Sequence, residues 1–392
     1  MKRFLFPGIL GFLFLSGISG YCAPSISNVT YSGTLAAGTT VTITGTAFST
    51  GPLVAIYDTF EYGTANSSIT AGAVADYGDW DGVTTDTCAP VYTTSDYYSG
   101  SQSIVTYSDC QPNLGEAYAE LRFSSATNVF MCMDWLIVGD WPGYYNTGAG
   151  SGVNNKFGWL MYNNSTTNTD FYFAYFNSST HTAPNSYGYY SNDASPYSKT
   201  FSFNASTTSA DPRTEADWHM NCSWVNGLPP GDIKFVDRTS TGTFAVRYTT
   251  TNLTTPFLSE PANQQTYWTL AHFPGYLRND PKGSQQKFHQ DNIYVSTGTG
   301  AAAHAVMFDQ PYLHASTKRV ILKPVTWTDT EITATLLSHA FSDGAAYFSV
   351  CDAQWICDDT GYAVTIGASQ AAGASGASST QKGITTKGVT FK

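Results

Sequence analysis

The side chains best suited to proton transfer in this sequence are arginines, histidines and tyrosines in strand-like runs. Lyase chemistry on a uronic-acid polymer needs a cation to neutralise the sugar carboxylate, and a Tyr or His to move protons at the neighbouring carbon. Residues of these types are Arg122, His219, Tyr276, Arg278 and His289. They form no compact motif, so we interpret them first as ordinary sheet and loop positions and keep the lyase as an alternative.

Paired carboxylates for glycoside hydrolysis are the second chemistry to consider. Two carboxyl groups must flank one glycosidic bond at about 5 to 10 Å. Glu116 and Glu120 share a strand face in "EAYAE", yet four strand residues separate them by roughly 13 Å. We therefore interpret them as solvated sheet positions and expect no hydrolase.

Aromatic side chains are numerous, at 15% of the chain, and favour carbohydrate binding. Sugars pack their apolar faces on flat rings, while amides and carboxylates bind their hydroxyls. The opposing interpretation is that these rings fill a β-sandwich core, and we expect roughly a third to face a ligand. The candidate ligand-binding residues are Trp80, Trp141, Tyr144, Trp218, Trp268, Tyr276 and Arg278.

An acidic turn, "DYGDWDG", is a candidate calcium site. Asp76, Asp79 and Asp81 precede Gly82, and clustered hard oxygen ligands in a glycine turn suit calcium. The spacing differs from an EF-hand loop and lacks its distal Glu. Acidic residues that bind turn backbone are the favoured interpretation, so we expect no metal or other cofactor, with calcium as the alternative.

The N-terminus predicts export. Lys2 and Arg3 precede an apolar run that ends at Leu15, and small residues follow up to Gly20, which is the pattern of a signal peptide over residues 1–20. The run is too short for a membrane span, and no later segment is apolar enough for one. We expect a secreted or cell-surface protein after cleavage, with lipidation of Cys22 as the lesser alternative.

Seven cysteines in an exported chain predict disulfides. The spacing in "CDAQWIC" favours a disulfide between two cysteines close in the sequence, and a second such disulfide is predicted upstream. The remaining two cysteines are candidates for a disulfide between distant parts of the chain, and Cys22 is left unpaired. The predicted pairs are Cys351 with Cys357, Cys88 with Cys110, and Cys132 with Cys222.

Composition predicts an all-β fold. Charged residues make up only 12% of the chain, and 26 Tyr, 23 Phe and 35 Gly accompany abundant Ser and Thr, which suits pleated sheets better than surface helices. The net charge of -11 argues against nucleic acid or an anionic membrane as a partner. Residues 368–392 begin with an uncharged Gly, Ala, Ser and Thr run and are expected to be a flexible tail.

The two ends of the mature chain resemble the halves of one IPT/TIG domain, an Ig-like fold of bacterial surface proteins. The resemblance lies in "GTTVTITGTAF" near the N-terminus and in "WTDTEI", "FSDGAAYFSVCDA" and "GYAVTIG" near the C-terminus. It implies a bacterial protein whose Ig-like domain comprises residues 23–52 plus 300–367. A second domain would then be inserted in a loop.

The intervening residues 53–299 resemble a concanavalin-like jelly roll, similar to laminin-G-type and lectin sandwiches. The resemblance rests on "YDTFEYGT", "GDW", "YSGSQS" and "FHQDNIYVSTG", with many strand-like runs between them. It implies an Ig-like sandwich interrupted by a larger jelly roll. We expect a non-catalytic carbohydrate-binding or adhesion module whose partner is a polysaccharide or cell-surface glycan. The alternatives are a polysaccharide lyase using Arg278, Tyr276 and either His219 or His289, and a self-associating structural subunit of a surface layer or fibre.

Overall fold

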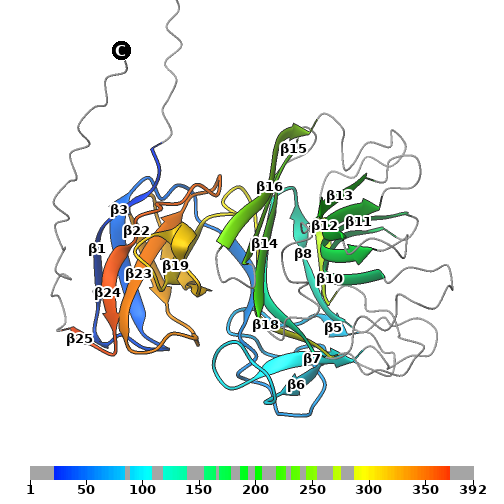
Figure 1. Ribbon diagram of the computed structural model, residues 1–392, viewed down its shortest axis with the longest axis horizontal. Coiled ribbons are helices and arrows are strands. Elements are labelled where there is room, and N and C mark those ends of the chain that lie inside the picture. Colours follow the sequence, from blue (N-terminus) through cyan, green and yellow to red (C-terminus); the bar gives the residue numbers. More distant parts are fainter. Residues whose placement is uncertain are drawn as a thin grey trace, which may run out of the picture.

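The computed structural model confirms that the chain is all-β. It describes residues 22–83, 89–107, 118–138, 154–164, 167–177, 186–192, 199–204, 218–226, 231–238, 244–253, 268–274 and 287–370. Within these ranges the only helical element is the single 3-10 turn η2 (Leu313–Ala315). Every sheet is antiparallel, and the strands gather into two sandwiches (Figure 1).

The first sandwich is built from both ends of the chain. One sheet has the order β1 (Ser25–Tyr31), β3 (Thr40–Thr46), β22 (Glu331–Thr335), β21 (Lys323–Trp327). The other has the order β20 (Arg319–Ile321), β19 (His304–Phe308), β23 (Gly344–Cys351), β24 (Tyr362–Ile366). Alternation creates the core, because Val41 and Ile43 of β3 pack with Met307 and Phe348 of the facing sheet.

The second sandwich is built from residues 53–297 and has two larger sheets. The sheet nearer the first sandwich, here the junction sheet, has the order β16 (Phe244–Leu253), β15 (Gly231–Arg238), β14 (His219–Asn226), β9 (Val129–Val138), β18 (Lys287–Thr297), β7 (Ser103–Tyr107), β6 (Val91–Thr93), and β4 (Leu53–Asp58) also pairs with β18. The other, here the distal sheet, has the order β13 (Lys199–Asn204), β12 (Ser186–Asn192), β11 (Thr167–Asn177), β10 (Asn154–Asn164), β17 (Trp268–Phe273), β8 (Ala119–Ala126), β5 (Gly82–Val83).

The core of the second sandwich lies between these sheets. Met133 and Trp135 of β9 point inward and pack in one buried cluster with Leu121 of β8 and Phe273 of β17. Because side chains alternate along a strand, Phe130 and Cys132 of β9 point to the opposite, outward face of the junction sheet.

The first sandwich covers the middle of that outward face. Phe130 lies 4.9 Å from the Trp355 ring in an edge-to-face contact and 5.0 Å from the His304 ring in a stack (centroid distances). The Tyr57 hydroxyl donates a 2.6 Å hydrogen bond to the backbone oxygen of Ile321, which belongs to the first sandwich. Buried residues of both sandwiches therefore form one apolar junction.

Two of the predicted disulfides are confirmed. Cys132 on β9 and Cys222 on β14 lie directly opposite each other and are bonded, and Cys351 is bonded to Cys357. Both pairs belong to the junction or pack against it. Cys22 is exposed and free, whereas the predicted pair of Cys88 and Cys110 lies outside the described residues.

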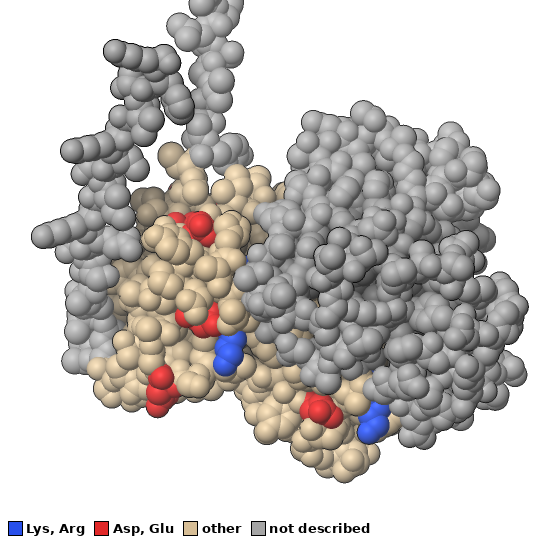
Figure 2. Space-filling model, viewed as in Figure 1, with Lys and Arg blue, Asp and Glu red and all other residues tan. Residues whose placement is uncertain are grey.

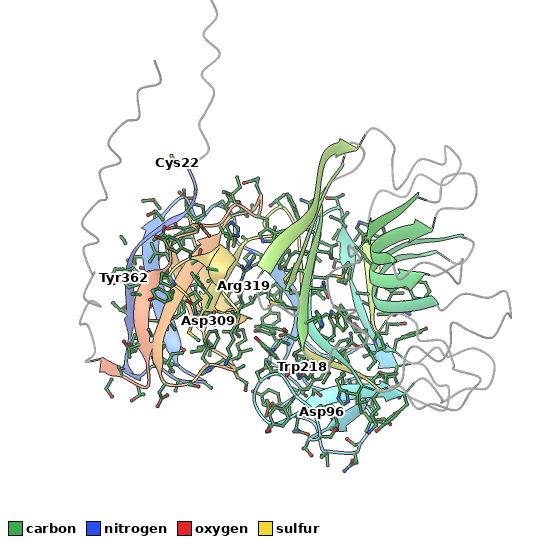
Figure 3. All side chains as sticks on the ribbon, in the orientation of Figure 1. Cys22, Asp96, Trp218, Asp309, Arg319 and Tyr362 are labelled. Atoms are coloured by element: carbon green, nitrogen blue, oxygen red, sulfur yellow. A yellow bond between two sulfur atoms is a disulfide. The ribbon has the colours of Figure 1, made fainter. Side chains whose placement is uncertain are left out.

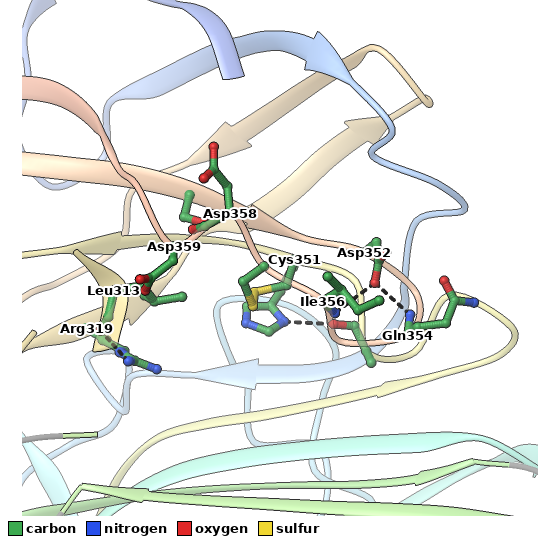
Figure 4. The surroundings of a disulfide bond; sticks show 12 residues. Leu313, Arg319, Cys351, Asp352, Gln354, Ile356, Asp358 and Asp359 are labelled. Atoms are coloured by element: carbon green, nitrogen blue, oxygen red, sulfur yellow. Dashed lines mark hydrogen bonds between the residues drawn. A yellow bond between two sulfur atoms is a disulfide. The ribbon is translucent and has the colours of Figure 1, made fainter. Parts of the chain in front are cut away.

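The short disulfide shapes the turn that enters the junction (Figure 4). Asp352 Oδ1 accepts the backbone N–H groups of Gln354 (2.9 Å) and Ile356 (2.8 Å) inside the Cys351–Cys357 loop. These bonds hold Trp355 at a positive φ of 55° and bury it against Phe130.

The start of the predicted tail is ordered. β25 (Ser369–Gln370) pairs with β2 (Gly33–Thr34), and Leu35 donates its backbone N–H to Ala368. The prediction of a flexible tail from residue 368 is therefore wrong at its first three residues, because backbone pairing outweighs the low-complexity composition there. The rest of the tail and the predicted signal peptide lie outside the described residues. Among those described, no helix is long and apolar enough to cross a membrane.

Candidate functional site

A polar and aromatic cluster lies on the outward face of the distal sheet. The strand register places Glu120 of β8 directly opposite His272 of β17, and His272 directly opposite Trp159 of β10. Directly opposed residues of an antiparallel sheet share a face. Their neighbours Ala119, Leu121 and Ala271 point into the core, so this row points away from it.

Glu120 is the centre of the cluster. Its Oε1 atom lies 2.5 Å from Arg122 Nε, and its Oε2 atom lies 3.2 Å from His272 Nε2. The Tyr118 ring stacks on the His272 ring at a centroid distance of 3.7 Å and an angle of 10°. The Trp159 ring meets the other side of the cluster edge-to-face, 5.5 Å from His272. We call these five residues the distal-face site.

The electrostatics of the site keep Glu120 ionised. The hydrogen bond with His272 is the main cause that lowers the pKa of the Glu120 carboxyl, with Arg122 adding to it, while partial burial acts in the opposite direction. The Arg122 side chain is 53% exposed and its Nε faces Glu120, so its guanidinium reaches solvent. A guanidinium that is fixed by one carboxylate can bind a second planar anion or sugar hydroxyls with its outer nitrogens.

Backbone contacts from the acidic turn fix the strand that carries Glu120 and Arg122. Asp81 Oδ2 accepts the Arg122 backbone N–H at 2.6 Å, and Asp81 donates its own N–H to the Glu120 carbonyl. Gly82 then pairs with Glu120 in β5. The prediction that Glu120 is a solvated sheet position is therefore wrong, because its side chain is only 15% exposed and has two charged or titratable partners.

The calcium candidates do not converge. Asp76 Oδ2 accepts the backbone N–H of Thr59 at 2.8 Å and its hydroxyl at 2.6 Å, and Asp81 binds the Arg122 backbone. In the described ranges, no three His, Cys, Asp or Glu side chains gather as a metal site would require. The acidic turn instead binds the backbone and hydroxyl of Thr59, which follows β4, and the backbone of Arg122 on β8, so the partners lie outside the turn itself.

The histidines of the lyase hypothesis lie on opposite faces of the junction sheet. His219 pairs with Trp135, and its ring stacks on the Trp135 ring 4.6 Å away inside the sandwich. His289 pairs with Leu136, one residue further along β9, and therefore points outward. Both are buried. They face opposite sides of the sheet because a one-residue offset in register inverts the face. The lyase hypothesis with either histidine stays a prediction.

Two of the predicted ligand-binding tryptophans are core residues. Trp80 is fully buried and donates Nε1 to Asp58 Oδ2 at 2.7 Å, and Trp268 is 2% exposed in the same core. Trp218 is half-buried near His289 on the outward side of the junction sheet. The remaining candidates, Trp141, Tyr144, Tyr276 and Arg278, lie outside the described residues.

Sequence reasoning missed Tyr118, Trp159 and His272 as site residues. The signal was present in part, since Tyr118, Glu120 and Arg122 alternate on one strand face, as polar or amphipathic residues do on an exposed sheet. His272 follows Glu120 by 152 positions, and only the pairing of β17 between β8 and β10 brings these residues together.

The visible charges are isolated. In Figure 2 the described surface is mostly uncharged, with single acidic and basic residues and no continuous basic patch on that face. This agrees with the low charge content of the sequence.

Comparisons with known proteins find only distant structural similarity. No family model matches the chain, and no curated protein matches it. The chain is similar to an endo-β-1,4-glucuronan lyase from the fungus Trichoderma reesei (13% identity, covering 60% of this chain and 98% of that one, TM-score 0.37). It is also similar to the cellulose-induced protein Cip1 (13%, 62% and 97%, 0.33) and to the botulinum neurotoxin serotype C1 binding domain (9%, 68% and 71%, 0.24). Similarity this distant carries no argument about activity, which must come from the site.

Proposed function

We propose that this chain is an exported carbohydrate-binding protein that holds a saccharide on the outward face of the distal sheet. The observation that carries the proposal is the distal-face site, in which an exposed Arg122 is fixed by Glu120 beside the rings of His272, Trp159 and Tyr118. Arg122 and the half-buried Tyr118 are the groups that a sugar would contact, while His272 (3% exposed) and Trp159 (9% exposed) are buried and would hold them in place. A flat ring next to directional polar groups is what sugar rings and their hydroxyls require.

The two faces of the second sandwich support this location. The middle of the junction sheet is covered by the first sandwich, whereas Arg122 on the distal sheet is 53% exposed. The first sandwich, which we still interpret as an IPT/TIG-like domain, would serve as a rigid mount. Two disulfides agree with an oxidising location outside the cell.

A glycan array with the full oxidised chain tests the proposal. We expect binding to a subset of polysaccharides, with preference for carboxylated sugars because Arg122 can bind a carboxylate in a fork geometry. Arg122→Ala should weaken that binding about tenfold, equivalent to about 1.4 kcal/mol. A matched control is Lys318→Ala, which removes a cation of the first sandwich and should leave binding unchanged. Absence of glycan binding at millimolar concentration would overturn the proposal.

A polysaccharide lyase is the second candidate, and the same site favours it. Arg122 would neutralise a uronate carboxylate, and His272 or Tyr118 would take the proton from the neighbouring ring carbon. The electrons of that C–H bond form the ring double bond as the glycosidic bond breaks, and the departing oxygen takes up a proton. Ultraviolet absorbance of an unsaturated product from a uronic-acid polymer, lost in His272→Ala, would establish the lyase. Binding without such a product would favour the non-catalytic module.

A further inference from the structure

We propose a second saccharide site, for neutral pyranose rings, at the end of the junction sheet where β6, β7 and β14 begin or end. It consists of Asp96, Tyr98, Trp218 and His289, here called the junction-end site. Figure 3 labels Asp96 and Trp218 close together at this end of the second sandwich. The site lies on the other sheet from the distal-face site and does not depend on it.

Two aromatic rings form one wall of the junction-end site. The Tyr98 and Trp218 rings lie 6.0 Å apart at 55°, and the Trp218 ring meets His289 edge-to-face at 6.5 Å. Both Tyr98 and Trp218 are half-buried. Rings of this kind, with one part packed and one part in water, are suited to pack against the C–H faces of a sugar.

A carboxylate supplies the polar group that a ligand can reach. The Asp96 side chain is 40% exposed, and its Oδ2 atom lies 3.6 Å from Nε2 of the fully buried His289, beyond hydrogen-bond distance. The Asp96 carboxylate is therefore free to accept a sugar hydroxyl on its exposed side. His289 is packed against it and would hold Asp96 and the Trp218 ring in place rather than contact the ligand.

The loop that carries Asp96 and Tyr98 is held rigidly. The buried Asp291 accepts the backbone N–H groups of Tyr98 (2.9 Å) and Ser99 (3.0 Å), and Ser103 donates its hydroxyl to the Asp96 carbonyl at 2.5 Å. A buried carboxylate that is bonded to two loop amides fixes the loop conformation before any ligand arrives. Such preorganisation reduces the entropy lost on binding.

Charge separates the ligands of the two sites. Asp96 would repel a sugar carboxylate and accept hydroxyl hydrogens, which selects neutral sugars, whereas Arg122 of the distal-face site selects acidic ones. One chain could then engage two components of a mixed polysaccharide at once, which would raise its avidity without new contacts.

Calorimetric titration of the full oxidised chain with cellohexaose, xylohexaose and a β-1,4-linked glucuronate hexamer tests the inference. We expect at least one neutral hexasaccharide to bind. Trp218→Ala should weaken this binding at least about tenfold and Trp218→Phe by less than about threefold, because a ring remains. Asp96→Asn keeps the size of a side chain that is 40% exposed and removes only its charge, and it should weaken this binding by about threefold or more.

Arg122→Ala separates the two sites. It should leave the neutral hexasaccharide unaffected while weakening the glucuronate hexamer. The inference is overturned if no neutral hexasaccharide binds at millimolar concentration. It is also overturned if Trp218→Ala, Trp218→Phe and Asp96→Asn all bind the neutral hexasaccharide as tightly as the parent. Loss of neutral binding in Arg122→Ala would overturn it as well. Binding of the glucuronate hexamer alone would leave the proposed function standing and remove the second site.

Discussion

The outward faces of the two sheets in the second sandwich differ sharply although their inward faces share one core. On the junction sheet, Phe130 and the Cys132–Cys222 disulfide point outward into an apolar cluster completed by Trp355 of the first sandwich. On the distal sheet, the equivalent outward positions carry Arg122 and Glu120. The same alternation therefore yields a packing face on one sheet and the proposed binding face on the other, and the chemistry of the outward residues makes the difference.

The largest expected loss of folding stability comes from changes on the packing face, which is the outward face of the junction sheet. Replacing Cys132 and Cys222 by Ala should lower the free energy of unfolding by about 4.5 kcal/mol, because that bond closes a loop with a sequence separation of 90. The same change at Cys351 and Cys357, with a separation of 6, should cost only about 2 kcal/mol. Urea unfolding of both double variants measures the difference, and equal losses would contradict the expected ranking.

Phe130→Ala should be nearly as costly. Phe130 is fully buried where the sandwiches meet, and deleting a buried aromatic ring typically costs about 3 to 5 kcal/mol. The matched change on the binding face, Arg122→Ala, should cost less than about 1 kcal/mol because the side chain is largely exposed. Urea unfolding compares them, and a Phe130→Ala variant as stable as Arg122→Ala would show that the junction contributes little to stability.

The smallest expected effect is the pH dependence of the binding face. The pKa of Glu120 is lowered in the folded chain, so its contribution to stability is present above the unfolded pKa of about 4.3 and is lost as the pH falls through the folded pKa. Glu120→Gln should therefore be less stable than the parent at pH 7, by less than about 1 kcal/mol given partial exposure. The two should converge at acid pH. A difference that grows on acidification would refute the assignment of Glu120 as an ionised partner of His272.

Composition and spacing were sufficient to predict the all-β class and two disulfides. Few charges and many aromatic and hydroxyl residues leave no amphipathic helix, and the short "CDAQWIC" spacing specifies a local staple. The IPT/TIG resemblance of the first sandwich stays a prediction.

The faces of strands could not be predicted from the sequence. Alternation places Trp268 on one side of its strand, but only the arrangement of sheets decides that this side is the core. His219 and His289 are both strand histidines, and their one-residue difference in register against β9 puts them on opposite faces.

The candidate site itself depends on long-range pairing. Glu120 and His272 meet because β17 inserts between β8 and β10, which no local pattern indicates. Of the residues weighed from the sequence, Glu120 and Arg122 lie in the distal-face site, and both were interpreted as ordinary sheet positions.

A structure of the full chain soaked with a glucuronate hexamer tests the central claim most directly. The proposed function predicts the sugar on the outward face of the distal sheet, with a carboxylate within about 3 Å of the Arg122 guanidinium and a ring near Trp159 or Tyr118. A hexamer bound only elsewhere on the molecule, with Arg122 still bonded to Glu120 alone, would contradict it.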